Sequence, residues 1–576
     1  MAQKFDPVTL EILWRRLISL VDEADAAVGR TAFSALIRDA HDYTCALFNS
    51  KGTLVCQSTY VTPGQLGGMT RGLKQTCTIF PREACKPGDV FLVNDPWMFA
   101  GHLNDICAIA PIFYQGKVVA FTATTFHHDD IGGRPGTLGR DVIEEGLFLP
   151  LVKLYDGGVL NQALMDVILK NVRVPENVEG DIRSQVTACH VCSEKLIMMM
   201  DETSLDSIDD LSEEINRLTE RSMRDAIEKV PDGTYRATRL VEQLGKEEDI
   251  KIQVAIEVNG SNVIADFDGS SPQVDWGVNI VYNFTYAYVH FALKTALDPH
   301  TPNNEGSTRP VILKAPEGSI VNCTYPAAVA ARTTPGHLIT EIIYEALAPA
   351  LPDRVLANSG TSGGIQCLLY GRRHTGKQFV FNLFVMGGLG AKSSVDGNTS
   401  LVFPGNASNM PLEIVESDTP LIAVKKEMIC DSGGPGKMRG GLAKEVAWKV
   451  PDDEYAPIPP VRIVSMGGRF KYPAKGLFGG KPGTRFVAII GDKVYDKGIA
   501  DENAYPGDII RYYSASGGGY GDPLERDPEK VEEDVINEYV SLEKAKEDYG
   551  VVIDPKTMKV DVAATEKLRE SLKQTK

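Results

Sequence analysis

Apolar residues recur at helical spacing near the start of the chain. Leu10, Leu13 and Leu17 lie three and four positions apart, which places their side chains on one face of a helix. Asp6-Pro7 stands just before them, and an Asp followed by proline is typical of a helix start. The pattern predicts a helix over residues 7 to 30.

Further along, short apolar runs bounded by turn residues predict strands. Residues 43 to 48 and 53 to 56 flank Asn49-Ser50-Lys51-Gly52, which is typical of a hairpin turn. VFLV follows Pro87-Gly88-Asp89 and predicts a short buried strand.

The longest pair of apolar runs predicts a second hairpin. ICAIAPIF (106 to 113) and KVVAFTATTF (117 to 126) lie on either side of Gln115-Gly116. Glycine supplies the positive φ that a tight turn between strands requires. A two-residue turn there pairs Tyr114 with Lys117.

This register brings polar residues from both ends of the hairpin together. It sets Asp105 opposite Phe126, so His127 lies close to Asp105, and His102 lies about one residue beyond the ladder. Two neutral imidazoles and a carboxylate suit zinc, manganese or iron, and leave positions open for water or substrate. The alternative is that they are polar residues at strand ends, and both interpretations stand at this point.

The rest of the chain alternates between helical and β-like blocks rather than between single elements. Residues 158 to 200 and the charged stretch from Leu205 predict helices, and Tyr235 to Phe267 alternates as strands do. The pattern predicts an α+β, multi-domain fold with mixed sheets and segregated helical blocks. The predicted regions are a metal-site domain (1–203), an α+β domain (204–345), a Gly-rich β-containing domain (346–525) and a charged helical tail (526–576).

Composition narrows the classes of partner. With 60 basic and 77 acidic residues the net charge is −17, which disfavours nucleic acid. The apolar runs stay short of about 18 residues, so we expect no membrane span. The first residues lack the basic-then-apolar order of a signal peptide, so we expect no export. The ten cysteines are therefore interpreted as reduced thiols of a cytoplasmic protein.

Four motifs are weighed and set aside. GRRHTGKQ (371 to 378) is one residue short of a phosphate-binding loop, and Gln378 replaces its Ser or Thr, so we expect a hairpin turn. The Gly-rich stretches 433–441 and 516–522 can cradle an anion, but we interpret them as turns of a β-rich domain. Cys189-His190-Val191-Cys192 lies in helical sequence and indicates buried packing.

Several motifs together resemble the hydantoinase B family. They are FDPVTLEIL near the start, RDAHDYTCALF (38–48), PGDVFLVNDP (87–96), GHLNDI (101–106), FHHDDIGG (126–133), EEGLFLP (144–150), CDSGGPGKMRGG (430–441) and SGGGYGDPLERDPEKV (516–531). The family contains the B-type components of ATP-dependent hydantoinases and lactamases, the C-terminal half of 5-oxoprolinase, and a large subunit of acetone and acetophenone carboxylases.

The resemblance implies a hetero-oligomeric enzyme with divided labour. An A-type subunit, hydantoinase A-like and with an actin-like ATPase fold, uses ATP to phosphorylate the carbonyl oxygen of a small-molecule substrate. The B-type subunit then carries a metal-dependent second step with one divalent ion. The family's ligands match His102, Asp105 and His127, plus an Asp of RDAHDY that we take as Asp42, with Asp39 as the competing candidate.

Two neighbours of His127 are candidates for chemistry. His128 or Asp129 can act as general base because each adjoins a ligand, and the alternative is that they only orient His127. One departure from the family is Trp97-Met98-Phe99-Ala100-Gly101, where relatives often have Gly-Gly-Thr before the His. These large apolar side chains either line a pocket for a bulky substrate or pack at an interface.

Three functions remain open on the sequence. The first is an ATP-dependent cyclic-amide hydrolase subunit for a hydantoin or lactam. The second is an ATP-dependent ketone carboxylase subunit, in which the metal stabilises an enolate-like species that attacks carbon dioxide. The acetone carboxylase subunit that this chain resembles is longer, which favours the first function. The large side chains of residues 97 to 101, the aromatic loop, favour a carboxylase acting on an aryl ketone. The third is a scaffold subunit whose metal is structural.

Overall fold

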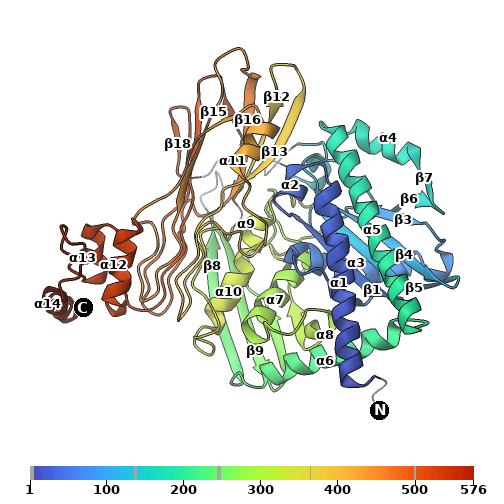
Figure 1. Cartoon of the computed structure of the whole chain (residues 1–576), viewed down its shortest axis with the longest axis horizontal. Helices are drawn as coiled ribbons and strands as arrows, with labels where there is room; N and C mark the ends of the chain where they lie inside the picture. Colours follow the sequence, from blue (N-terminus) through green and yellow to red (C-terminus); the bar gives the residue numbers. More distant parts are fainter. Residues whose placement is uncertain (1–4, 135–138, 243–247, 364, 498–500, 576) are drawn as a thin grey trace.

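The computed structural model describes residues 5–134, 139–242, 248–363, 365–497 and 501–575 (Figure 1). Helices and strands are grouped in blocks with four separate sheets, so the predicted α+β class is confirmed. The four predicted regions stay a prediction, and the boundary placed at residue 345 falls inside the helix Leu338–Leu347.

The N-terminal region is built on a seven-stranded sheet in the order β2-β1-β5-β4-β3-β6-β7. Its strands are β1 (Tyr43–Asn49), β2 (Leu54–Gln57), β3 (Val90–Val93), β4 (Asp105–Tyr114), β5 (Lys117–His127), β6 (Val152–Asp156) and β7 (Val159–Leu160). Its helices are α1 (Pro7–Thr31), α2 (Ala35–Arg38), α3 (Pro63–Ile79), α4 (Gln162–Lys170) and α5 (Pro175–Thr203), with short 3-10 turns η1 (Arg82–Ala84) and η3 (Val142–Glu145).

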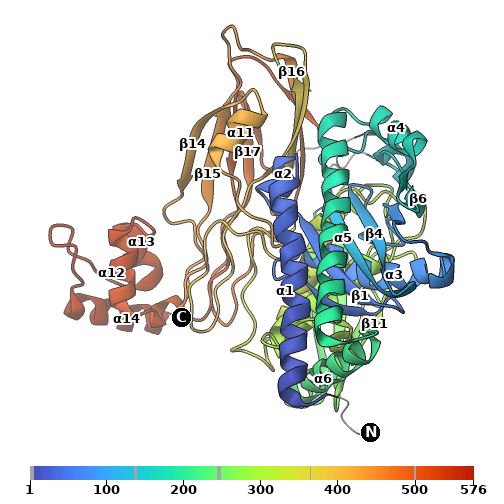
Figure 2. The same ribbon diagram turned by 45° about the vertical axis from the view of Figure 1, so that its right-hand side comes forward.

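Both faces of this sheet are covered. Cys45 and Leu47 of β1 pack against α1 and α5, which lie side by side (Figure 2). Ala46 and Phe48, the alternate residues, pack against α3 on the other face. Strands buried on both faces carry apolar residues at successive positions rather than at alternate ones, which explains the continuous apolar runs of the central hairpin.

The register of the central hairpin differs from the predicted one. Tyr114 pairs with Lys117 as expected, but the pairing shifts by one position between Ile112 and Phe113. Beyond this bulge an extra residue on β5 changes every pair, and Asp105 lies opposite His127 rather than Phe126. In the observed register the side chains of Asp105 and His127 lie closer together than the predicted register implied.

The second region packs helices on a four-stranded sheet in the order β11-β10-β9-β8. Its elements are α6 (Asp209–Ile227), β8 (Gly233–Val241), β9 (Ile250–Asn259), β10 (Asn262–Asp266), α7 (Tyr282–Leu297), α8 (Glu305–Thr308), β11 (Val311–Lys314), α9 (Thr333–Gly336) and α10 (Leu338–Leu347). Alternate residues of β9 are buried, and α10 contacts β8, β9 and α7. The one-sided burial explains the alternating sequence.

The third region is a sandwich of two sheets, ordered β13-β12-β16-β19 and β14-β15-β20-β17-β18. Its elements are β12 (Ile365–Arg372), β13 (Gln378–Phe384), α11 (Leu412–Asp418), β14 (Ile422–Met428), β15 (Lys444–Lys449), β16 (Ile458–Gly467), β17 (Val487–Ile490), β18 (Lys493–Tyr495), β19 (Glu502–Ala504), β20 (Ile509–Tyr513) and η4 (Pro523–Glu525). Residues 373 to 377 form the turn between β12 and β13, so the hairpin predicted for GRRHTGKQ is confirmed.

Glycine-rich segments continue from the sandwich as extended chain, packed backbone to backbone (Figure 1). Gly441 donates to Leu389, Gly517 donates to Gly441, and Gly434 donates to Gly517, each N···O distance being 2.9 Å. The stretches 433–441 and 516–522 were expected to be turns. They instead form a layer of extended chain, bridged antiparallel between Met438 and Tyr520, which side chains would force apart.

The C-terminal tail is a small cluster of helices set apart from the main body (Figures 1 and 2). It consists of α12 (Pro528–Ile536), α13 (Leu542–Tyr549) and α14 (Val562–Thr575). The Asp527 side chain accepts a hydrogen bond from the backbone N–H of Glu529 and so caps the start of α12.

Two further expectations concern the whole chain. All ten cysteines are free, and Cys189 and Cys192 are buried on α5, as the sequence indicated. Among the helices of the described ranges, none is both long enough and apolar enough to cross a membrane.

The glycine layer predicts a sharp difference between two Gly→Ala changes. A Cβ on Gly440 would lie 2.0 Å from the carbonyl oxygen of Gly517, and backbone cannot move aside as a side chain can. We expect Gly440→Ala to lower the free energy of unfolding by about 1–3 kcal/mol or more. In Gly29→Ala the new Cβ has nothing within 4 Å, so this helical site should gain roughly 0.5–1 kcal/mol. Equal denaturation midpoints for the two variants would contradict the packing.

Candidate metal centre

Three strand ends meet at one edge of the N-terminal sheet. Asp42 precedes β1, Asp105 begins β4, and His127 ends β5. Because β1 and β4 both pair with β5, these ends are neighbours, and the backbone N–H of His127 donates to the carbonyl of Asp42 at 3.1 Å. His102 lies in the loop between β3 and β4, directly after Gly101.

Gly101 allows this loop to turn into the site. Its φ is +93°, a conformation that side chains strongly disfavour. A Cβ there would also lie 3.0 Å from the side chain of Arg332. The glycine therefore lets His102 and Arg332 approach the same carboxylate.

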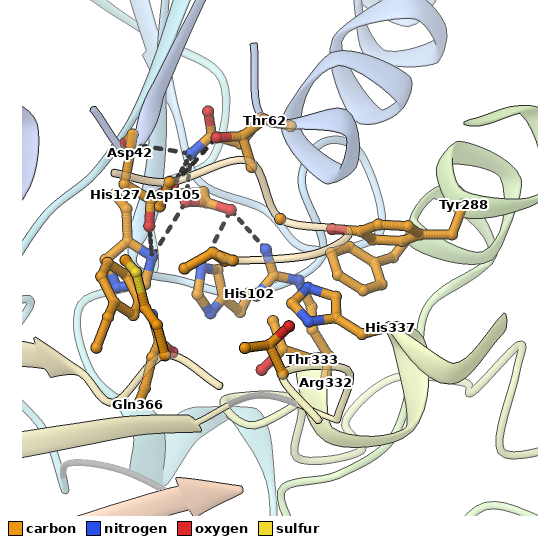
Figure 3. Close-up of a pocket in the computed structure, with 18 of the residues that line it drawn as sticks. Asp42, Thr62, His102, Asp105, His127, Tyr288, Arg332, Thr333, His337 and Gln366 are labelled. Carbon is orange, nitrogen blue, oxygen red and sulfur yellow. Dashed lines mark hydrogen bonds and ion pairs between the residues drawn. The ribbon is translucent and has the colours of Figure 1, made fainter. Parts of the chain in front are cut away.

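His102, Asp105 and His127 form a buried triad (Figure 3). The Nε2 atom of His102 lies 3.1 Å from Oδ2 of Asp105, and Nδ1 of His127 lies 3.5 Å from Oδ1. One potential ligand atom from each residue lies within 4.8 Å of the others. Within the described part of the chain this is the one His, Cys, Asp and Glu cluster with such spacing, so a metal ion can be held here.

The protonation of His102 supports a cation at this point. Its Nδ1 lies 3.3 Å from the carbonyl oxygen of Ala330 and its Nε2 lies 3.1 Å from Oδ2 of Asp105, so both ring nitrogens face acceptors. Burial, with the positive charge of Arg332, lowers the pKa of His102 to about 4, so the ring is neutral. A neutral ring carries one N–H, so one of its two nitrogens faces an acceptor with a lone pair. Two acceptors at this distance repel unless a cation lies between them, and the donor set therefore fits a divalent metal.

The same carboxylate keeps its charge in the interior. Burial opposes ionisation, but His102 and Arg332 hold the pKa of Asp105 well below its usual range. Burial would lower the pKa of His127, yet its hydrogen bond to Asp105 and the charge of Asp42 outweigh burial and raise it. Asp105 therefore offers an ionised carboxylate as one of the three ligand groups.

Asp42 lies beside the triad, and Asp39 does not. Oδ2 of Asp42 is 3.8 Å from Nδ1 of His127, and the side chain lines the same cavity. Burial raises the pKa of Asp42, as expected for a carboxyl far from water. Asp39 instead pairs with Arg38 at 2.7 Å at the end of α2.

Gln65 of α3 connects the two carboxylates, and sequence reasoning missed it. Its Nε2 donates to Oδ1 of Asp42 at 3.3 Å and to Oδ1 of Asp105 at 3.2 Å. Thr44 fixes the amide by donating to its Oε1 at 2.9 Å. The amide therefore sets the distance between the two carboxylates. A Gln in the first turn of a helix carries no local signal for this role, because its partners lie on or beside distant strands.

Arg332 was missed for the same reason. Its Nη2 donates to Oδ2 of Asp105 at 2.6 Å, and its Nε donates to the carbonyl of Ala100 at 2.8 Å. The guanidinium also lies over the ring of Phe284 at 4.2 Å. Glu145 holds the preceding segment by accepting from the backbone N–H groups of Val329 and Ala330.

The triad opens into a cavity of about 60 Å³, room for several waters. Its walls come from all three regions, including Phe284 and Tyr288 of α7, Gln366 of β12, Phe384 of β13, Met386 and Val402. The aromatic loop before His102 is not part of these walls. Phe99 is buried against α3, and the Trp97 indole donates to the carbonyl of Cys323 at 2.9 Å. The aromatic loop therefore gives no support for a bulky substrate.

The two candidate bases are placed differently. The Nε2 atom of His128 lies 3.2 Å from Oε1 of Gln185 on α5, away from the cavity. Asp129 lines a second, smaller cavity that also touches His102 and His127, and accepts from Asn382 at 3.1 Å. Burial raises the pKa of Asp129 to about 7.

Comparison with known proteins agrees with this architecture. The family model for hydantoinase B/oxoprolinase matches residues 6–523. A protein of Pseudomonas sp. strain NS671, provisionally named as the B-type component of a D-/L-hydantoinase, is 30% identical over 99% of this chain and 98% of its own length. The crystal structure of the ATP-dependent caprolactamase from Pseudomonas jessenii aligns with a TM-score of 0.90 at 28% identity, covering 99% of this chain and 100% of that one. A nucleotide-free acetone carboxylase structure has the same TM-score at 20% identity, covering 99% and 83%, and shares the fold.

The geometry predicts which residues retain metal. We expect His102→Ala and His127→Ala each to lower the bound metal, measured by elemental analysis after gel filtration, at least tenfold. His290→Ala removes another buried histidine, outside the triad, and should retain the wild-type metal content. Unchanged content in both triad variants would rule out the site.

Proposed function

The chain belongs to the hydantoinase B/oxoprolinase family, and on this premise we propose that it is the B-type subunit of an ATP-dependent cyclic-amide hydrolase. The substrate class is a hydantoin or lactam whose carbonyl oxygen a partner subunit phosphorylates. The observation that carries the proposal is the buried triad of His102, Asp105 and His127, which lines a cavity together with the aromatic side chains of α7.

Two relatives support hydrolysis over other chemistry. The relatives named for hydantoinase and caprolactamase align over nearly their whole length at 28–30% identity. The hydantoinase relative is named as one subunit of its enzyme, which supports a heteromeric complex for this chain as well. The partner we propose is an A-type, actin-like ATPase that holds ATP.

A divalent cation held by His102, Asp105, His127 and, as the proposed fourth ligand, Asp42 would supply Lewis-acid chemistry and favour deprotonation of water. Zinc, manganese and iron all suit this mixture of imidazole and carboxylate ligands.

The protein's own groups prepare the site for that chemistry. Arg332 and Gln65 hold the carboxylate of Asp105 from two sides, so the ligand geometry exists before substrate arrives. The apolar walls exclude bulk water, which strengthens every charge interaction inside.

Of the two candidate bases we favour Asp129 over His128. The Asp129 carboxyl lines the small cavity that adjoins both triad histidines, where a water can lie. Water adds to the activated carbonyl carbon and its proton passes to the carboxylate of Asp129, which returns it to the ring nitrogen as the C–N bond breaks. A second water hydrolyses the acyl phosphate that remains to a carboxylate and inorganic phosphate. His128, hydrogen-bonded to Gln185 on α5, supports the position of β5.

A ketone carboxylase subunit is the second candidate, because the acetone carboxylase structure shares the fold over 99% of this chain. That chain is longer, and the aromatic loop that favoured an aryl ketone is packed in the interior. Both observations favour hydrolysis.

Reconstitution with the partner tests the function. We expect the complex to open a hydantoin or lactam ring only with ATP, and a chelator to stop ring opening. Asp105→Asn should lower ring opening at least 100-fold, since the variant loses a ligand charge. Bicarbonate-dependent consumption of a ketone, without ring opening, would instead establish the carboxylase. Full activity of Asp105→Ala with intact fold would indicate a structural metal.

The choice between Asp42 and Asp39 is tested by metal affinity. We expect Asp42→Asn to weaken metal binding, measured by titration calorimetry, at least tenfold. Asp39→Asn affects only a contact with Arg38 and should leave the affinity within twofold. The opposite pattern would assign the fourth ligand to Asp39.

A further inference from the structure

One wall of the metal cavity carries polar groups that the ligand set does not use. Arg332, Thr333 and His337 follow one another around α9 and the start of α10, and all three line the cavity. Figure 3 shows Arg332 and His337 next to each other, facing the triad from the side opposite His127.

The guanidinium of Arg332 is only half used. Nε and Nη2 donate one hydrogen each, to Ala100 and Asp105, which leaves three of the five N–H hydrogens, two of them on Nη1. Nη1 is buried and has no hydrogen-bond partner among the described residues. A buried cationic donor without an acceptor is costly, so an acceptor supplied by a ligand would stabilise it.

His337 adds a second unpaired group at the same wall. The ring is 7% exposed, and its Nδ1 finds no partner in the described part of the protein. Burial and the neighbouring charge of Arg332 lower the pKa of His337 to about 3, so the ring is neutral and donates one N–H. Tyr288 packs edge-on against it at 5.2 Å and fixes its plane.

The charge of the cavity also favours an anion. Asp42 and Asp105 are the two acidic residues of its lining, Arg332 is the basic one, and the rest of the lining is uncharged. A divalent cation on the two carboxylates leaves a net charge of about +1 (−2 + 1 + 2) in a site walled by Phe284, Phe384 and other apolar side chains. Water is scarce there, so the excess charge acts strongly on a ligand.

We propose that Arg332 and His337 form an oxyanion-binding subsite beside the metal, which takes a phosphoryl or carboxylate group of the substrate. This assignment rests on the proposed function and deepens it, because it states that the group entering the cavity is anionic. A phosphoryl group would come from the activated carbonyl, and a carboxylate from a substituent on the ring. Arg332 provides a planar fork for two oxygens, and His337 provides one further donor.

The test measures anion binding without turnover. The full-length chain, loaded with Mn²⁺, is titrated with inorganic phosphate by calorimetry, and broadening of the ³¹P resonance shows that the anion lies near the metal. We expect Arg332→Lys, which keeps the charge but loses the fork, to raise the Kd at least tenfold. His337→Gln should raise it about threefold to tenfold.

Matched controls separate the subsite from general effects. His290→Gln changes a buried histidine outside this cavity, and Arg71→Lys changes an arginine that stacks on Tyr282. Both should bind phosphate within twofold of wild type. His337→Gln leaves the ion pair of Arg332 with Asp105 intact, so the test stands if Arg332→Lys does not fold.

A parallel titration with acetate identifies the source of the oxyanion. Arg332-dependent binding of phosphate alone assigns a phosphoryl group, and such binding of acetate alone assigns a carboxylate. The subsite is overturned if neither anion binds the loaded protein, or if both variants bind as wild type does. Because metal content and ATP-dependent ring opening are measured separately, failure of the subsite is distinguishable from failure of the proposed function.

Discussion

The buried carboxylate of Asp105 is the group on which the site depends. One oxygen faces His127 and Gln65, and the other faces His102 and Arg332. A buried charge is tolerated only when several partners compensate it. Here the partners come from a hairpin, a helix and a segment 227 residues further along the chain, so the charge can be satisfied only when these parts are assembled.

This requirement explains why the cavity lies between regions rather than within one. The N-terminal sheet supplies the ligands, the second region supplies Arg332 and His337, and the sandwich supplies Phe384 and Gln366. Each of the three largest hydrophobic clusters centres on one region and takes a few residues from a neighbour, as Leu103 and Leu36 of the N-terminal region show. The chemistry is placed where these cores meet, which excludes water without burying any ligand inside a single core.

The glycine-rich layer serves the same assembly. Segments around Gly388, Gly440 and Gly517 approach so closely that a methyl group would meet backbone at about 2 Å. Such contact leaves the extended chain with little freedom, so it is a stiff support for the sandwich that closes the cavity. The sequence alone predicted turns here, because the missing Cβ of glycine allows both a tight turn and close backbone packing.

Local pattern determined the hairpin, the first helix, the buried strands and the convergence of His102, Asp105 and His127, because these depend on residues close in sequence or paired across one turn. Family resemblance added Asp42. The one-residue shift that sets Asp105 opposite His127 was beyond the pattern, since a bulge reflects packing on both faces of the sheet. Gln65, Arg332 and His337, the closed cavity and the inward packing of Phe99 were decided only by tertiary structure. Their partners lie tens to hundreds of residues away, and no spacing along the chain records which distant groups must satisfy a buried charge.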